Sequence, residues 1–203
     1  MRLEGRLVGL QERVSTKALL GSEWLSIRQD RVVDQFGRYS DYWVLERLSF
    51  VLLIPYRKRD DHVALVRYFR YPVGRWFWEF PQARLSDDNP EALTGVAAQL
   101  ALDLFGRSAA DSSISIIGGF YEAYGYSDHR CYCVLAELEG DPMAMETPRL
   151  PITRWEPRKA LVRAPLDLGI GDAATIASLA LLNSHDVLPH RPPSAPRVDH
   201  SES

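Results

Sequence analysis

The chain has 203 residues, of which 46% are hydrophobic, 25% charged and 10% aromatic, so its composition is that of a globular protein and excludes a disordered or fibrous one. Lysine and arginine total 24 against 27 aspartates and glutamates, and the net charge of -3 argues against nucleic-acid binding. No apolar run approaches the roughly 20 residues that cross a bilayer, and no apolar signal core follows Met1, so we expect a cytoplasmic protein without a membrane segment.

The N-terminal region predicts extended structure. Residues 1–22 have a weak pattern with closely spaced glycines, which predicts an extended arm. Apolar and polar residues then alternate over residues 24–28, 31–33 and 42–45. The segment 34–38, which contains Gly37, has the composition of a turn. Together these segments predict an aromatic-rich β-hairpin.

The middle of the chain combines strand and helix patterns. Apolar stretches predict strands at residues 50–54, 63–69, 113–119 and 131–137. From Pro90 to Phe105 apolar residues recur at helical spacing instead, after an Asn89–Pro90 start and before a stop at Gly106. We therefore expect a buried helix over these residues.

The C-terminal part predicts a short strand at 152–155 and helices at 158–163 and 172–182. The loop from Tyr121 to His129 is rich in aromatic residues and suits the rim of a pocket. Prolines recur after Leu188 and the last residues are polar, so residues 188–203 are expected to form a disordered tail.

Two cysteines, Cys131 and Cys133, stand one residue apart in a stretch that reads as extended. We expect their side chains to face opposite sides of the strand and not to bridge each other. A metal or redox pair is the alternative, but it would need a closer match to Cys-x-x-Cys and further ligands. Free structural thiols in a reducing compartment are the expectation.

Four stretches in a fixed order carry a resemblance to a known family. They are the strand Val63–Gly74, the Trp-Glu-Phe-Pro-Gln-Ala run at 78–83, the Tyr-Glu-Ala-Tyr-Gly-Tyr-Ser-Asp loop at 121–128, and Trp155 with Gly169–Thr175. Over roughly residues 24–183 the chain resembles the Nudix superfamily, and within it the branch that hydrolyses ADP-ribose and related nucleoside diphosphate sugars. Tyr68 stands where the family has glutamine, Ala83 where it has glycine, and His129 where this branch has a glutamate used as base.

The resemblance implies an α/β fold of the Nudix kind, with a mixed β-sheet sandwiched between α-helices and an N-terminal β-hairpin region. In this branch the N-terminal region tends to pack across a homodimer, so a homodimer is implied as well. We expect three parts: residues 1–47 as arm and hairpin region and possible dimer contact, 48–187 as the Nudix domain, and 188–203 as the tail.

The family's catalytic box departs most from the pattern. Its glutamates share one face of a helix, so that their carboxylates converge on divalent cations at a pyrophosphate. Anchored at Ala83, the box positions hold Asn89, Ala97, Ala98, Ala101 and Leu102. Anchored at Gly106, with a two-residue insertion in the preceding loop, they hold Gln99, Leu100, Asp103 and Leu104. One carboxylate remains, and the leucines indicate a helix rebuilt as core.

Several side chains are candidates for binding or catalysis. By resemblance Arg67, Arg70 and Arg84 surround a diphosphate, for which the planar guanidinium is suited. Glu79 and Asp128 are further ligand-binding candidates, Asp103 is a weak metal ligand and catalytic candidate, and His129 is a candidate base. For the aromatic group Trp76, Phe77 and Trp78, core packing or a subunit contact is favoured over base stacking.

Two functions remain. The first is a catalytically impaired Nudix-like protein that binds a nucleotide-linked small molecule, or a partner protein, in the former pocket. The second is an active pyrophosphatase that splits a nucleoside diphosphate sugar with Mg²⁺, using a non-standard ligand set such as Asp87, Asp103, Asp128 and His129. The missing glutamates favour the first, and Mg²⁺ is expected as a cofactor only if the protein is active.

Overall fold

The computed structural model describes residues 10–87, 89–106, 113–138 and 152–185. The predicted tail at 188–203 lies outside the described residues, as does the start of the predicted arm. Contacts divide the chain into two units. The smaller unit takes the chain up to Leu48 and adds Ala123–His129, and the larger holds Ser49–Glu122 and the chain from Arg130 onward. Each unit is described by itself.

The smaller unit contains a three-stranded antiparallel sheet. Its strands are β1 (Gln11–Gly21), β2 (Ser26–Asp34) and β3 (Tyr39–Glu46), in the order β1-β2-β3. The predicted hairpin is β2–β3, and its turn is fixed by the Asp34 carboxylate, which accepts the backbone N–H groups of Phe36 and Arg38. The predicted extended arm is a third strand, because β1 pairs with β2 along its whole length.

An ionic network takes the place of an apolar core on one face of this sheet. Asp30 in the central strand is 5% exposed and accepts hydrogen bonds from Thr16 Oγ1 (2.5 Å) and Arg28 Nε (2.9 Å). Arg28 also pairs with Glu46, which accepts a further bond from Ser26 Oγ (2.7 Å). Every residue of β1 is exposed. A single layer with so little buried apolar surface is normally stable only when another layer covers it.

The larger unit is built on a mixed sheet. Among its described residues the strands are β4 (Phe50–Arg57), β5 (His62–Arg70), β6 (Arg75–Glu79), β7 (Gln82–Arg84), β8 (Ile114–Tyr121), β9 (Arg130–Glu137) and β10 (Thr153–Pro157). The order is β10-β5-β4-β9-β8, with β6 paired to β5 and β7 paired to β4. β4 and β9 run parallel, whereas the other described pairs are antiparallel.

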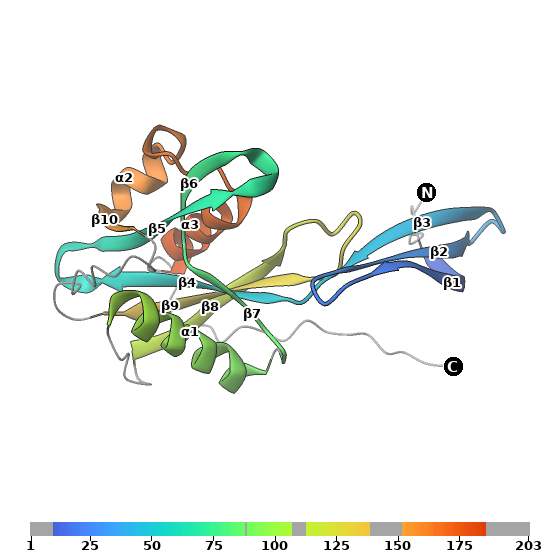
Figure 1. The fold of residues 1–203 in the computed structure, drawn as a ribbon, viewed down its shortest axis with the longest axis horizontal. Coiled ribbons are helices and arrows are strands. Elements are labelled where there is room, and N and C mark those ends of the chain that lie inside the picture. Colours follow the sequence, from blue (N-terminus) through green and yellow to red (C-terminus); the bar gives the residue numbers. More distant parts are fainter. Residues whose placement is uncertain (1–9, 88, 107–112, 139–151, 186–203) are drawn as a thin grey trace, which may run out of the picture. The chain divides into compact units, whose positions relative to one another are not determined.

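Helices cover both faces of this sheet (Figure 1). They are α1 (Pro90–Phe105), α2 (Arg158–Arg163) and α3 (Ala173–His185), with short 3₁₀ turns at Lys58–Asp60, Tyr71–Val73 and Leu166–Leu168. β4 contributes to both interiors: Val51 and Leu53 point into the core beside α1, and Leu52 and Ile54 into the core beside α2 and α3. This alternation is the period of two expected of a strand buried on both sides, and the mixed sheet between helices is the predicted architecture.

Helix α1 has the bounds that the sequence predicts. Asn89 caps its N-terminus, because the side chain accepts the backbone N–H of Ala92 (2.8 Å), and Pro90 occupies the first turn. Gly106 ends the helix in the left-handed conformation (φ 62°), which glycine adopts without steric cost. The buried stripe that faces the sheet consists of Leu93, Ala97, Ala101 and Phe105.

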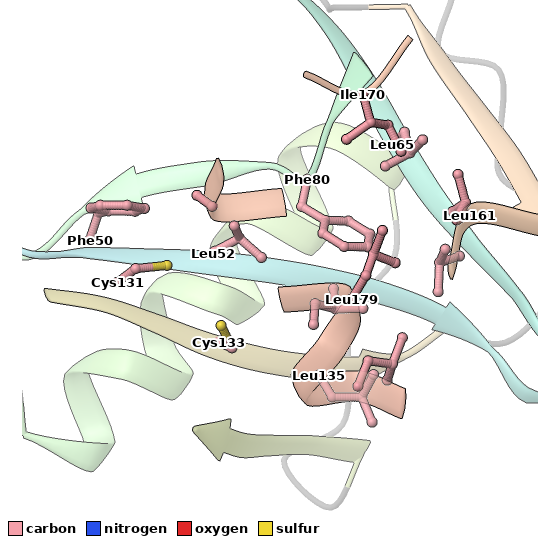
Figure 2. Packing of buried hydrophobic residues seen from close by; sticks show 14 residues of the cluster. Phe50, Leu52, Leu65, Phe80, Cys131, Cys133, Leu135, Leu161, Ile170 and Leu179 are labelled. Carbon is pink, nitrogen blue, oxygen red and sulfur yellow. The ribbon is translucent and has the colours of Figure 1, made fainter. Parts of the chain in front are cut away.

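The two cysteines lie on the same face of β9, so the expectation of opposite faces is wrong. Residues i and i+2 of a strand point to the same side, and both thiols enter the core beside α3 (Figure 2). Both are free, and Cys133 Sγ lies 3.1 Å from the hydroxyl of Ser178 on α3. That hydroxyl donates to the carbonyl of Ala174, so the Cys133 thiol is the donor to Ser178. No helix among the described residues is long and apolar enough to span a membrane.

Candidate ligand site

The β5–β6 hairpin carries most of the predicted ligand-binding residues, and its register decides where they point. Directly opposed residues of an antiparallel pair share a face, and alternate residues of a strand change face. Arg67 lies opposite Trp78, and Val66 lies opposite Glu79. Arg67 and Arg70, three positions apart in an extended strand, therefore point to opposite faces, and the structure does not bring these two guanidinium groups together.

Arg70 and Glu79 do come together. The Glu79 side chain is 1% exposed, and both its oxygens accept Arg70 Nε, at 2.9 and 3.0 Å, with a further bond from Nη2. The bond to Glu79 raises the pKa of Arg70. Arg70 Cζ also lies 5.4 Å from the centre of the Tyr68 ring. Glu79 is thus a carboxylate already neutralised by its own hairpin, and it holds Arg70 in place.

A second carboxylate, Asp172, belongs to the same electrostatic group. It caps α3, because Oδ1 accepts the backbone N–H of Thr175 at 2.8 Å. Oδ2 is buried and has no hydrogen-bond partner among the described residues. Burial raises the pKa of Asp172, as does the negative charge of Glu79, whereas the hydrogen bonds with Thr175 and the charge of Arg70 lower it, and burial prevails. Asp172 is therefore a carboxyl group whose neutral form the fold favours.

The segment before α3 completes the outer edge of β6. The N–H of Trp78 donates to the carbonyl of Gly169 (3.1 Å), and the N–H of Phe80 donates to Thr175 Oγ1 (3.1 Å). A side chain at Gly171 would meet the Phe77 ring at 2.9 Å, so glycine is required for this close approach. Asp172 thus lies in the chain between Gly169 and Thr175, the two residues that are hydrogen-bonded to the end of the β5–β6 hairpin.

On α1 the three positions that the Gly106 anchor of the sequence resemblance equates with glutamates are Leu100, Asp103 and Leu104. Leu100 and Leu104 are half-buried and pack against the core on that side of the sheet. Asp103 is exposed, and its Oδ1 accepts a hydrogen bond from Gln99 Nε2 at 2.6 Å. The remaining carboxylate is thus directed to solvent and tied to a neighbour one turn away.

The other predicted residues are spread over both units. Arg84 is exposed at the end of β7, and Asp87 accepts the N–H of Asn89 (3.0 Å) in the loop before α1. Asp128 and His129 belong to the smaller unit, where Asp128 is exposed and His129 is 4% exposed. Among the described residues, no group of three or more His, Cys, Asp or Glu side chains is placed to hold a metal ion.

His129 is held by the strand at the end of the hairpin. The Ser127 hydroxyl donates to the Leu45 carbonyl at 2.5 Å, and His129 Nδ1 lies 2.7 Å from Ser127 Oγ. Because the single hydroxyl proton points to Leu45, Nδ1–H is the donor to Ser127. The N–H of Leu45 in turn donates to the Tyr126 carbonyl (2.8 Å), so this loop continues the edge of β3.

Sequence reasoning missed two features of the site. Asp172 had a usable signal, since an aspartate three residues before Thr175 at a helix start is a typical N-cap. The contact of Arg154 in β10 with Trp78, at 4.3 Å from Cζ to the ring centre, had no local signal, because it joins strands about 75 positions apart in the chain. Only the sheet order brings these residues together.

Comparison with known proteins identifies the fold. No protein-family model and no curated protein matches the sequence. A solved structure described as "Crystal structure of ADP compounds hydrolase" is similar to the chain, with a TM-score of 0.71, 16% identity, and coverage of 89% of this chain and 96% of that chain. At this identity the likeness concerns the fold. The chain shares the α/β fold of that structure, with a mixed sheet between helices as the sequence predicts, and the predicted N-terminal hairpin is part of a three-stranded sheet.

Proposed function

We propose that this chain is a Nudix-like protein with an impaired catalytic box that binds a nucleoside diphosphate-linked molecule, or a partner, without rapid hydrolysis. One observation carries the proposal. Of the three helix positions that hold glutamates in the family, Leu100 and Leu104 pack against the core, and the carboxylate of Asp103 points to solvent with Gln99 bound to it. Convergence of carboxylates on a divalent cation needs the opposite arrangement.

Binding without metal is supported by each arginine separately, since Arg67 and Arg70 point to opposite faces of the β5–β6 hairpin. Arg67 is exposed on the β5–β6 hairpin, and Arg70 is held in a fixed orientation by Glu79. A guanidinium that is already positioned loses less freedom when it contacts a phosphate oxygen. The similar solved structure is that of a hydrolase of ADP compounds, and we carry that ligand class to this chain as part of the proposal.

The active alternative rests on three exposed acids. Asp87, Asp103 and Asp128 are all exposed, so each carboxylate has solvent access, and Mg²⁺ usually takes one or two carboxylates together with substrate phosphates. In this alternative the protein would split a nucleoside diphosphate sugar with Mg²⁺. The two functions differ in one measurable respect, which is whether Mg²⁺ and turnover accompany binding.

The test is a thermal-shift panel with ADP-ribose, other nucleoside diphosphate sugars and dinucleotides, each with and without Mg²⁺. Release of phosphate after a coupled phosphatase is recorded in parallel. A ligand that binds the native state raises the melting temperature by mass action, so an inactive protein still reports its ligand. We expect a shift that does not need Mg²⁺ and no turnover. A Mg²⁺-dependent shift with turnover would establish the alternative, and no shift with any ligand would contradict nucleotide binding.

The proposal includes a homodimer in the cytoplasm. The three-stranded sheet exposes large apolar side chains on its two outer strands, Val14 and Leu20 on β1 and Tyr39 and Trp43 on β3. A second copy of the chain is an occupant that would bury them. The two free thiols agree with a reducing compartment. Light scattering after size-exclusion chromatography should give twice the 23.0 kDa chain mass, and a monomer at micromolar concentration would contradict the dimer.

A further inference from the structure

Arginine and aromatic side chains form a ladder across one face of the β5–β6 hairpin. Arg154 Cζ lies 4.3 Å from the centre of the Trp78 ring. Arg67 Cζ lies 6.0 Å from the same ring and 5.3 Å from that of Trp76, so it stands between the two indoles. Phe69 meets Trp76 edge-on, with ring centres 5.5 Å apart and an interplanar angle of 61°. Contacts of this kind hold each member in a defined orientation.

The inner end of this ladder is structural. Trp78 packs against the core beside α3, and its backbone N–H is bonded to Gly169. Arg154 donates to the carbonyl of Leu168 at 2.5 Å and lies 3.3 Å from a carboxylate oxygen of Glu156. These contacts anchor the rest of the ladder to the sheet.

The outer end is open. Trp76 is 57% exposed, Phe69 is 48% exposed, and Arg67 is exposed beside them. The hairpin supplies no acid to this end, because Glu79 is the sole carboxylate in the sequence from Val63 to Glu79 and it is bonded to Arg70 on the other face. Among the described residues, the contacts of the Arg67 guanidinium are with the two indole rings.

An exposed indole in contact with a guanidinium that has no acidic partner among the described residues favours one kind of ligand. A flat ring can stack on the indole, and a negative group can accept hydrogen bonds from the guanidinium. A cationic ligand would be repelled by Arg67. A nucleotide combines the two complementary features, a π-face and phosphate oxygens separated by a sugar.

We propose that Trp76 and Arg67 form a nucleotide-binding platform, in which the base stacks on Trp76 and a phosphate pairs with Arg67. The inference takes its ligand class from the proposed function. It goes beyond that function by naming Trp76 as the residue that contacts the base. Stacking accepts any base, so the platform selects for the presence of a base and a phosphate, not for adenine.

Isothermal titration of the full chain tests the platform. The ligands are ADP and ADP-ribose, with ribose 5-phosphate and inorganic pyrophosphate as probes that lack a base. Loss of a base–aromatic stack weakens binding about 5- to 150-fold. Trp76→Ala should lose this factor for ADP and ADP-ribose and leave pyrophosphate unchanged, and Trp76→Phe should retain most of the affinity. Arg67→Met should weaken all four ligands.

Val73→Ala is the matched control, since Val73 is 61% exposed on the same hairpin and lies outside the ladder. If the unaltered chain binds ADP and Trp76→Ala binds it equally well, the platform is wrong and the proposed function stands. If Val73→Ala loses as much affinity as Trp76→Ala, the loss comes from the hairpin as a whole and the platform is equally wrong. If the unaltered chain binds no base-bearing ligand, both proposals fail.

Discussion

Arg70 and Glu79 lie diagonally on one face of the β5–β6 hairpin, and a half-exposed guanidinium pairs with a carboxylate that is 1% exposed. This pair joins the two strands on the face opposite the arginine–tryptophan ladder. The ion pair therefore restrains the two strands from the side opposite the exposed aromatic residues.

Arg70→Met should destabilise the protein strongly. It leaves the buried Glu79 carboxylate without its partner, and breaking a buried ion pair by removing one member costs about 3–5 kcal/mol. We expect the lower end of that range, because 43% of the Arg70 side chain is exposed. Urea unfolding measures the change. Arg75→Met is the control, because Arg75 lies opposite Arg70 in the pairing of β5 with β6. It should change the free energy of unfolding by no more than about 0.5 kcal/mol.

Asp172→Asn should change the dependence of stability on pH. The folded-state pKa of Asp172 is raised, chiefly by burial, above the unfolded value of about 3.9. Its contribution to stability is therefore fully present below pH about 4 and is lost as the pH rises through the folded-state pKa. Asparagine keeps the cap on Thr175 and stays neutral.

Relative to the unaltered chain, Asp172→Asn should gain stability in denaturant titrations as the pH rises above about 4, until the pH passes the raised folded-state pKa of Asp172. Asp103→Asn, which alters an exposed carboxylate on α1, is the matched control. A constant difference between Asp172→Asn and the unaltered chain at every pH would contradict the buried, neutral-favouring environment and leave only a local packing effect.

The three-stranded sheet should open first on acidification. Hydrogen bonds from Thr16 and Arg28 lower the pKa of Asp30, and the bond from Ser26 lowers the pKa of Glu46. Unfolded carboxyls titrate at about 3.9 and 4.3, so the stabilisation is present above these values and is lost as the pH falls through the lower folded-state pKa values. Amide exchange over β2 and β3 should therefore accelerate below pH about 4 before exchange over β4 does.

Asp30→Asn should abolish most of that difference between the sheets, since it removes the charge that the network serves. Simultaneous acceleration of β2 and β4 in the unaltered chain would show that the ionic network is not the acid-labile element.

Leu100→Glu with Leu104→Glu should not restore rapid hydrolysis. Both leucines pack against the core beside α1, so the change puts two charges against apolar surface and lowers the melting temperature. Ala83 and the loop before α1 also differ from the family's box, so a complete ligand set would still be missing. Mg²⁺-dependent release of phosphate from ADP-ribose measures the outcome. Full recovery of turnover in this double variant would refute the proposal of a helix rebuilt as core.

Local sequence patterns were sufficient to predict helix α1 and most of the strands. Helix α1 was predicted to the residue, because Asn89, Pro90 and Gly106 carry start and stop signals that act through the adjacent backbone. The hairpin β2–β3 and the strands β4, β5, β8 and β9 were predicted in place, with ends that shift by a few residues. These elements have a clear period, and β4 and β9 are buried on both sides.

Features that depend on distant partners were harder to predict. Strand β1 has no buried residue, so its sequence lacks the alternation of apolar and polar residues that predicts a strand. Only its pairing with β2 identifies it as a strand. Arg67 and Arg70 point to opposite faces because side chains alternate along a strand. The sequence prediction placed both arginines around one diphosphate by family resemblance and did not apply this alternation. The attachment of Ser127 to Leu45 joins residues 82 positions apart, and nothing in either segment signals the other.

The parallel pair β4–β9 also sets the order in which the protein can be assembled during synthesis. Phe50 lies opposite Cys131, 81 positions further along the chain, so the central strand gains this neighbour only after most of the polypeptide has been made. At a translation rate of about 5–20 residues per second, that wait lasts on the order of 4–16 s. During this interval the apolar segment Val51–Ile54, which is fully buried in the folded chain, has no β9 beside it, and exposed apolar segments of this kind favour aggregation.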